Sequence, residues 1–158
     1  MPHEQLVPSR RPGHLGTWVR GITVRQPWAT CVIAGKNIEN RPVHWPWRGW
    51  LLLHAGQATE RAPLRDPLVA TAIRGRDLHT SAVIGIARLT DCHQDPAGTP
   101  SCAPWAQTDA WHLVLADVHE LPLPIAAVRR QLGAWKPTQA LVDQVRLQLP
   151  QLTPESAS

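Results

Sequence analysis

Gly21-Ile-Thr-Val-Arg-Gln-Pro-Trp28 is the stretch that decides the fold of this chain, together with Gly35-Lys-Asn-Ile-Glu-Asn-Arg41. Residues 20–25 alternate between apolar and polar side chains, which predicts a half-buried strand. Pro27 suits the first turn of a helix, and Gly35 suits its end. Residues 37–41 alternate again. The two stretches therefore predict a β-helix-β unit dense in polar groups.

The rest of the chain adds further strands and two helices. Residues 49–55 are apolar on both faces, as in a central strand, and Pro122 and Pro124 are expected to end the last strand by turning the chain. Gly85 is expected to mark a bulge or a close backbone approach. The other expected elements are a short helix near residues 68–74, a strand over 81–91, a loop over 92–110, a strand over 111–121, and a final helix capped by Thr138 and ended by Pro150.

Several strands with few helices predict an α+β fold, namely a small mixed β-barrel with flanking helices rather than a doubly wound parallel sheet. The 158 residues fit a single domain. We expect this domain to cover residues 18–149. Residues 1–17, rich in Pro, Arg and Gly, are expected to be a disordered arm, and residues 150–158 a frayed tail.

Hydropathy and cysteine usage indicate a cytoplasmic protein with no membrane partner. No apolar run approaches the roughly 20 residues needed to span a bilayer, and the N-terminus lacks the apolar stretch of a signal peptide. Cys31, Cys92 and Cys102 form an odd set, which argues against a disulfide framework. We expect a monomer.

The net charge of +4 is distributed unevenly. Residues 10–76 carry eleven Lys/Arg against three acidic residues, giving +8, whereas residues 77–158 carry five against eight, giving −3, and Glu4 supplies the remaining −1. The first half therefore favours an anionic partner such as nucleic acid, although a solvated arginine-rich surface explains the charge equally well. The eight tryptophans can stack on bases or pack in the core.

Charged side chains in the opening unit are the strongest indication of a site. Arg25 ends its strand beside a helix N-terminus, where it can help to seat an anion. Glu39 and Arg41 share a strand face, so they can pair with each other or with Arg25 and Lys36. A carboxylate among cations has a lowered pKa and can accept a hydrogen bond from the amino group of a base. The alternative is a structural ion-pair network with no ligand.

Three segments together resemble a known family. Ile22-Thr-Val-Arg-Gln-Pro-Trp-Ala29, Lys36-Asn-Ile-Glu-Asn-Arg41 and Arg48-Gly-Trp-Leu-Leu-Leu-His-Ala55 closely resemble the ASCH (activating signal cointegrator homology) domain of the PUA-like superfamily. The match is dense over residues 20–57 and looser to about residue 135. Many members have one more residue between the tryptophan and the Glu-Asn-Arg triplet, so a tighter turn before Lys36 is expected here.

The resemblance implies a PUA-like β-barrel and a module that binds single-stranded RNA or DNA, or a nucleotide, without a cofactor. The positions that match the family motif are Arg25, Gln26, Trp28, Lys36, Glu39, Asn40 and Arg41. Arg48 and His54, in the third matching segment, complete the expected nucleic-acid-binding set.

Two other functions stay open. The superfamily includes amidohydrolases that act on N4-acetylcytidine through a lysine, a nearby threonine nucleophile and a more distant glutamate. Lys36 matches the lysine, but Glu39 occupies the threonine position, and a carboxylate cannot replace the hydroxyl without a change of mechanism. Glu39 activating water, with Lys36 stabilising charge, is the catalytic pair expected if the chain is an enzyme. The third function is protein interaction, with a purely structural polar motif.

A zinc site formed by Cys92, His93, Cys102 and His112 is conceivable from the residue types alone. Their spacing lacks the paired Cys-x-x-Cys knuckles of structural zinc sites. We therefore expect no metal site.

Overall fold

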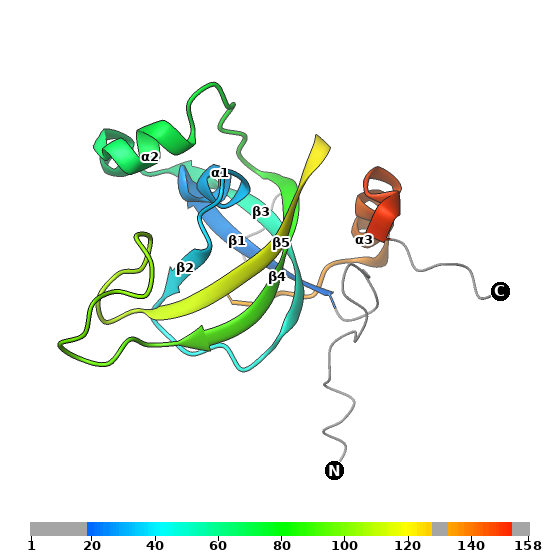
Figure 1. The fold of residues 1–158 in the computed structure, drawn as a ribbon. Helices are drawn as coiled ribbons and strands as arrows, with labels where there is room; N and C mark the ends of the chain where they lie inside the picture. The colour runs from blue at the N-terminus through cyan, green and yellow to red at the C-terminus, as the bar shows by residue number, and fades with distance from the viewer. Residues whose placement is uncertain (1–18, 128–132, 153–158) are drawn as a thin grey trace, which may run out of the picture.

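The computed structural model describes residues 19–127 and 133–152 and shows an α+β fold on one five-stranded mixed sheet (Figure 1). The α+β class expected from the sequence is confirmed. In chain order the elements are β1 (Val19–Gln26), α1 (Trp28–Ile33), β2 (Ile38–Arg41), β3 (Gly49–Thr59), the 3₁₀ helix η2 (Ala62–Arg65), α2 (Pro67–Ala72), β4 (Ala82–His93), β5 (Trp111–Ala126), α3 (Gln139–Gln148) and the 3₁₀ helix η3 (Pro150–Leu152).

The sheet is strongly curled but is not closed by strand pairing. The strand order is β1-β3-β4-β5-β2, with β1 parallel to β3 and the other neighbours antiparallel. Among the residues described, no backbone ladder joins the edge strands β1 and β2, so the closed barrel expected from the sequence is not formed by pairing. A side chain links these edges instead, because Arg41 Nη2 of β2 donates to the Thr23 carbonyl of β1 at 2.9 Å.

Strand β3 is buried on both faces, as its apolar sequence predicted. Leu51 and Leu53 belong to a core cluster that includes Ala29 and Val32 of α1, on one face of the sheet. The alternate residues of β3 belong to a second cluster, on the other face, which α3 covers (Figure 1). The second cluster includes Trp50, Leu52, Trp135, Leu141 and Val145.

The prediction that Pro122 and Pro124 turn the chain is wrong, because β5 continues to Ala126. The two prolines lie where the pairing of β4 with β5 shifts register, from Gly85 opposite Glu120 to Val83 opposite Ile125. Proline has no N–H to donate to a ladder, and such an irregularity demands none.

Gly85 combines the bulge and the close approach expected from the sequence. A Cβ at this position would lie 2.6 Å from Ile33 Cδ1 of α1 and 2.7 Å from the carbonyl oxygen of His119. The missing side chain therefore lets α1 sit directly on β4.

The C-terminal helix begins where it was expected, since Thr138 Oγ1 accepts a hydrogen bond from the backbone N–H of Leu141. Order continues past the expected boundary, because Leu152 is buried in the second core cluster. The expected tail thus begins no earlier than residue 153, and both that tail and the expected arm of residues 1–17 lie outside the described residues.

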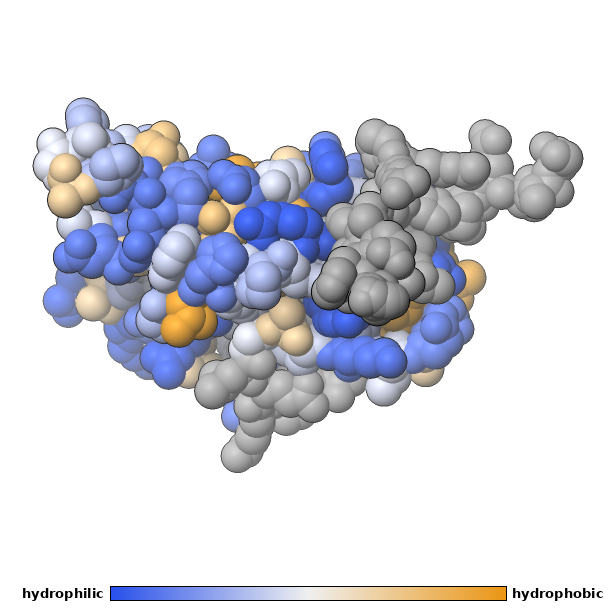
Figure 2. Space-filling view, turned by 90° about the horizontal axis from the view of Figure 1, so that it is seen from below, coloured by the Kyte–Doolittle hydropathy of each residue, from blue (hydrophilic) through white to orange (hydrophobic). Residues whose placement is uncertain are grey.

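No helix within the described ranges is long and apolar enough to cross a bilayer. The face seen in Figure 2 is mostly hydrophilic, with apolar residues as separate spots. Among the residues that the structure describes, the exposed large apolar side chains are Val43, Leu68, Leu123 and Leu147.

Candidate functional site

The turn between α1 and β2 sets the direction of Lys36. Gly35 has a φ of +121°, a conformation that residues with a Cβ rarely adopt. The backbone N–H of Lys36 then returns to the carbonyl of Cys31 at 2.8 Å. The turn directs the lysine side chain into the protein.

The ammonium group of Lys36 is buried and committed to partners within the protein. The side chain is only 2 % exposed. Nζ donates to Glu39 Oε1 at 2.9 Å and to the Ile38 carbonyl, and it lies 5.5 Å from the centre of the Trp28 ring. Two of its three donors thus bond to oxygen, and an aromatic face lies nearby.

Glu39 lies between two cations, as the shared strand face predicted. Its Oε1 accepts from Lys36, and its Oε2 lies 3.3 Å from Arg41 Nη2. Burial alone raises the pKa of a carboxyl group, but the charges and hydrogen bonds of Lys36 and Arg41 outweigh burial, and the pKa of Glu39 is lowered. Glu39 is therefore a fixed, ionised hydrogen-bond acceptor.

A cleft of about 680 Å³ opens beside this carboxylate. One wall is Trp28, whose indole Nε1 donates to Glu60 Oε2 at 2.7 Å. The two cations that line the cleft, Arg25 and Arg41, are matched in charge by two lining carboxylates, Glu39 and Glu60. The lining residues are Thr23, Val24, Arg25, Trp28, Glu39, Asn40, Arg41, Pro42, Gly56, Gln57, Ala58, Glu60 and Gln107.

Five of the nine predicted site residues line the cleft: Arg25, Trp28, Glu39, Asn40 and Arg41. Arg25 is exposed, as its strand position predicted. These five come from β1, α1 and β2, so the β-helix-β unit identified in the sequence brings them together.

The other four, Gln26, Lys36, Arg48 and His54, do not line the cleft. Lys36 lies behind Glu39. Arg48 donates to the carbonyls of Trp45 and Trp47. His54 is 1 % exposed and contacts Thr23 Oγ1 through Nδ1 at 3.1 Å.

Gln26 bonds to a backbone N–H at the start of α1, where the sequence predicted an anion-binding position. Its Oε1 accepts from the backbone N–H of Thr30 at 3.0 Å, and its Nε2 donates to the carbonyl of His79 at 2.7 Å. That N–H of the helix therefore already has a protein partner. The six-residue α1 is also too short to provide a strong dipole.

Two further residues that line the cleft, Glu60 and Gln107, were not among the predicted site residues. Asn40 explains the place of Gln107, because Asn40 Oδ1 accepts from the Gln107 N–H and Asn40 Nδ2 donates to the Trp105 carbonyl, each at 2.9 Å. The β4–β5 loop is thereby attached to β2. The acidic position of Glu60 at the end of an apolar strand was the available signal for its role.

The β4–β5 loop also gathers a second set of polar side chains. His93, Cys102 and His112 come together there, and Asp95 joins them. Cys92, which was grouped with them on the sequence, is elsewhere: it is buried, and its Sγ accepts from the Trp45 N–H at 3.4 Å.

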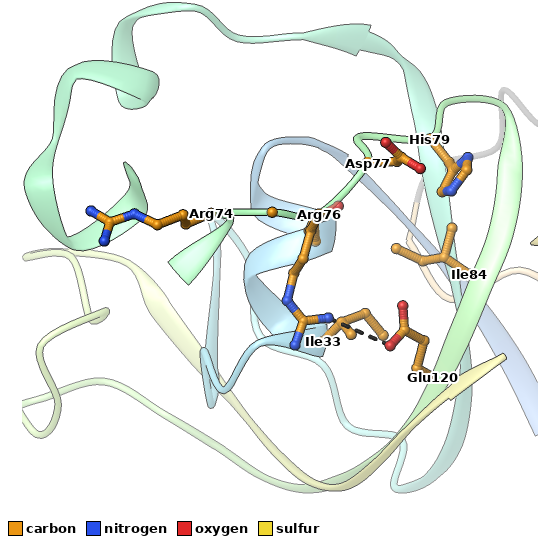
Figure 3. Close-up of a pocket in the computed structure, with 9 residues that line it drawn as sticks. Ile33, Arg74, Arg76, Asp77, His79, Ile84 and Glu120 are labelled. Carbon is orange, nitrogen blue, oxygen red and sulfur yellow. Dashed lines mark hydrogen bonds and ion pairs between the residues drawn. The ribbon is translucent and has the colours of Figure 1, made fainter. Parts of the chain in front are cut away.

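A further hollow of about 500 Å³ lies between α1, residues 74–79 and strands β4 and β5. Figure 3 shows Arg76 extending to Glu120, while Arg74 points away from the hollow. The Arg76–Glu120 pair spans 3.4 Å, and its side chains are 37 % and 61 % exposed. Such solvated pairs contribute little, and none of the nine predicted residues lines this hollow. The Glu39 cleft is the stronger candidate site.

Comparison with known protein families and with curated proteins found no match for the chain.

Proposed function

We propose that the chain is a recognition module that binds one nucleotide unit of a single-stranded nucleic acid in the Glu39 cleft. The observation that carries the proposal is the Glu39 carboxylate, ionised and held by Lys36 and Arg41 beside the indole of Trp28. A fixed carboxylate can accept hydrogen bonds from the exocyclic amino group of a base. An aromatic wall can pack against the base itself.

The fold proposed for this module is the PUA-like barrel of the ASCH domain. Support comes from the curled sheet and from Arg41, whose side chain spans the two edge strands where backbone pairing stops. Support also comes from the sequence resemblance, whose motif supplies the five predicted site residues that line the cleft from β1, α1 and β2.

The charge of the cleft favours a single nucleotide over a long polyanion. The two lining cations are matched by two carboxylates, so the cleft itself carries no formal net charge. Attraction for flanking phosphates comes from the exposed Arg25 at the rim and from the basic first half of the sequence.

Substitution of Trp28 and Arg25 tests the proposal. We expect Trp28→Ala to raise the Kd for a labelled single-stranded RNA about 5- to 150-fold, because one stacked base contributes about 1–3 kcal/mol. We expect Arg25→Ala to reduce the slope of log K against log[salt] by about 0.7, because one phosphate contact is lost. Fluorescence anisotropy over a series of salt concentrations measures both.

The matched control is Arg88→Ala, since Arg88 pairs with Asp117 outside the cleft and should leave the affinity and the salt slope unchanged. Absence of RNA and single-stranded DNA binding at low salt, or equal weakening by Arg25→Ala and Arg88→Ala, would refute the proposal.

The same cleft makes a base preference testable. A carboxylate acceptor favours bases that carry an exocyclic amino group, so we expect oligo(C) and oligo(A) to bind more tightly than oligo(U). Competition of each oligomer against one labelled probe gives the ranking. Tightest binding of oligo(U) would contradict a role of Glu39 as the base acceptor.

Hydrolysis of a modified nucleoside is the second candidate, because two carboxylates, Glu39 and Glu60, line one cleft and such groups can act as acid and base. The commitment of Lys36 to internal partners disfavours it. Incubation of the protein with N4-acetylcytidine decides the matter: no release of cytidine at stoichiometric protein eliminates this candidate. Release that Glu60→Gln abolishes and the exposed control Glu120→Gln retains would establish it.

A further inference from the structure

Four side chains with metal-binding atoms meet at the base of the β4–β5 loop. His93 ends β4, and the antiparallel register places His112 of β5 directly opposite it. Asp95 and Cys102 come from the loop between them. One ligand atom from each of the four residues lies within 4.8 Å of all the others.

Three spacings among these groups are close to those of a tetrahedral zinc site, and the widest separation in the set is within 4.8 Å. His93 Nε2 lies 3.4 Å from Asp95 Oδ1, and His112 Nδ1 lies 3.7 Å from Asp95 Oδ2 and 3.6 Å from Cys102 Sγ. Zinc binds nitrogen and oxygen at about 2.0–2.2 Å and sulfur at about 2.3 Å, so ligand atoms at tetrahedral corners lie roughly 3.3–3.7 Å apart. The widest pair must close by up to about 1 Å to reach this range on binding the ion.

The other ring nitrogen of each histidine lies within hydrogen-bond distance of an acceptor outside the cluster. His93 Nδ1 lies 3.0 Å from Asp91 Oδ2, and His112 Nε2 lies 2.7 Å from the backbone carbonyl of Gln107. A carbonyl can only accept, so the proton of neutral His112 is on Nε2 and its Nδ1 carries a lone pair. Metal-binding histidines are oriented by partners of this kind.

The resulting arrangement directs lone pairs toward one another. In the neutral histidines, His93 Nε2 and His112 Nδ1 both face the carboxylate of Asp95, which has no proton to offer when ionised. The backbone N–H of Cys102 donates to Asp95 Oδ2 at 2.8 Å and holds the carboxylate in place. Apart from the thiol proton of Cys102, whose Sγ lies within hydrogen-bonding distance of His112 Nδ1, these ligand atoms offer only lone pairs. A cation that displaces that proton can be coordinated by all four groups.

We propose that His93 Nε2, Asp95, Cys102 Sγ and His112 Nδ1 bind one zinc-class dication. A set of two imidazoles, a thiolate and a carboxylate suits zinc and disfavours calcium and magnesium, which prefer oxygen ligands. On binding, the thiol of Cys102 releases its proton to solvent. With four protein ligands the site is structural, and it fastens a loop that has no strand or helix of its own.

The sequence alone predicted no metal site, and this proposal replaces that prediction. The group considered on the sequence contained three of the four proposed ligands, but Cys92 is a core residue and Asp95 takes its place. The ligand spacing follows the strand register of His93 and His112 rather than a knuckle motif.

Cobalt titration tests the proposal. After chelation and dialysis, we expect Co²⁺ to bind the full chain in one-to-one ratio, with the intense ligand-field bands of a tetrahedral complex and a thiolate-to-cobalt charge-transfer band. Zinc should displace the cobalt and raise the Tm. Cys102→Ser should abolish the charge-transfer band and weaken binding at least tenfold, and Asp91→Asn should weaken it about 10- to 100-fold.

Cys92→Ala is the matched control, because it removes a neighbouring cysteine and should keep the cobalt spectrum. Cys102 is exposed, so Cys102→Ser does not disturb the core. An octahedral cobalt spectrum, a charge-transfer band that survives in Cys102→Ser, or a zinc effect on Tm that is equal in wild type and Cys102→Ser would overturn the proposal.

Discussion

Glu39→Gln will lower the free energy of unfolding by about 3–5 kcal/mol, the range found when one partner of a buried ion pair is removed. Both carboxylate oxygens face a cation, Oε1 toward Lys36 and Oε2 toward Arg41. Glutamine must therefore direct its amide NH₂ group at one of the two cations, and Lys36 is left buried without a counter-charge. Because domains are stable by only about 5–15 kcal/mol, urea unfolding will show the loss clearly.

The control for this substitution is Glu120→Gln, which breaks an exposed pair with Arg76 and should change stability by at most about 1 kcal/mol. Equal effects of the two substitutions would contradict the buried-pair interpretation.

The same pair makes stability depend on pH. The pKa of Glu39 is lower in the folded chain than its ordinary value of 4.5, so below that value the unfolded chain takes up a proton that the folded chain does not. The contribution of Glu39 is thus complete above pH 4.5 and is lost as the pH falls through the folded pKa. The stability difference between wild type and Glu39→Gln should narrow over that acid range; a constant difference would contradict the assignment.

Gly21→Ala is expected to destabilise the fold by at least about 1–3 kcal/mol, the range for overpacking a core, because the added Cβ must displace a buried indole ring. A Cβ at Gly21 would lie 2.2–2.4 Å from three ring atoms of Trp135, which is 3 % exposed. The ring cannot withdraw freely, because the two residues exchange backbone hydrogen bonds of 2.7 and 3.0 Å, and Trp135 Nε1 donates to Thr23 Oγ1. Thermal and urea unfolding measure the effect.

Gly56→Ala is the matched control, since its nearest contact is a methyl group of Thr23 at 3.2 Å, and it should cost less than about 1 kcal/mol. A double-mutant cycle with Trp135→Ala isolates the clash: in the absence of the ring, Gly21→Ala should be nearly neutral. Full additivity of the two substitutions would show that the ring is not the cause.

Local sequence pattern predicted most of the secondary structure, because alternation and capping are local. The burial of β3 on both faces and the Thr138 cap followed directly from such patterns. The extent of β5 did not, since Pro122 and Pro124 are compatible with a strand only where the partner strand shifts register. The prediction of a barrel closed by strand pairing was not met for a similar reason, because pairing between strands at distant edges leaves no signature in the local sequence.

The candidate site was predicted in part for the same physical reason. The alternation of β2 correctly placed Glu39 and Arg41 together, but it could not show that Lys36 and Gln26 bond internally rather than to a ligand. Gln107 reaches the cleft only through the side chain of Asn40, a contact between residues far apart in sequence. Side-chain partners of this kind become visible only in three dimensions.

Gln107 is a residue of the β4–β5 loop that also lines the cleft. Its N–H is held by Asn40 in the cleft wall, and its carbonyl accepts from the buried ring of His112. We therefore expect a displacement of His112 to shift Gln107, which lines the cleft. Any coupling of this kind is reciprocal: if a group bound at one position changes the affinity at the other by some factor, the second changes the affinity at the first by the same factor.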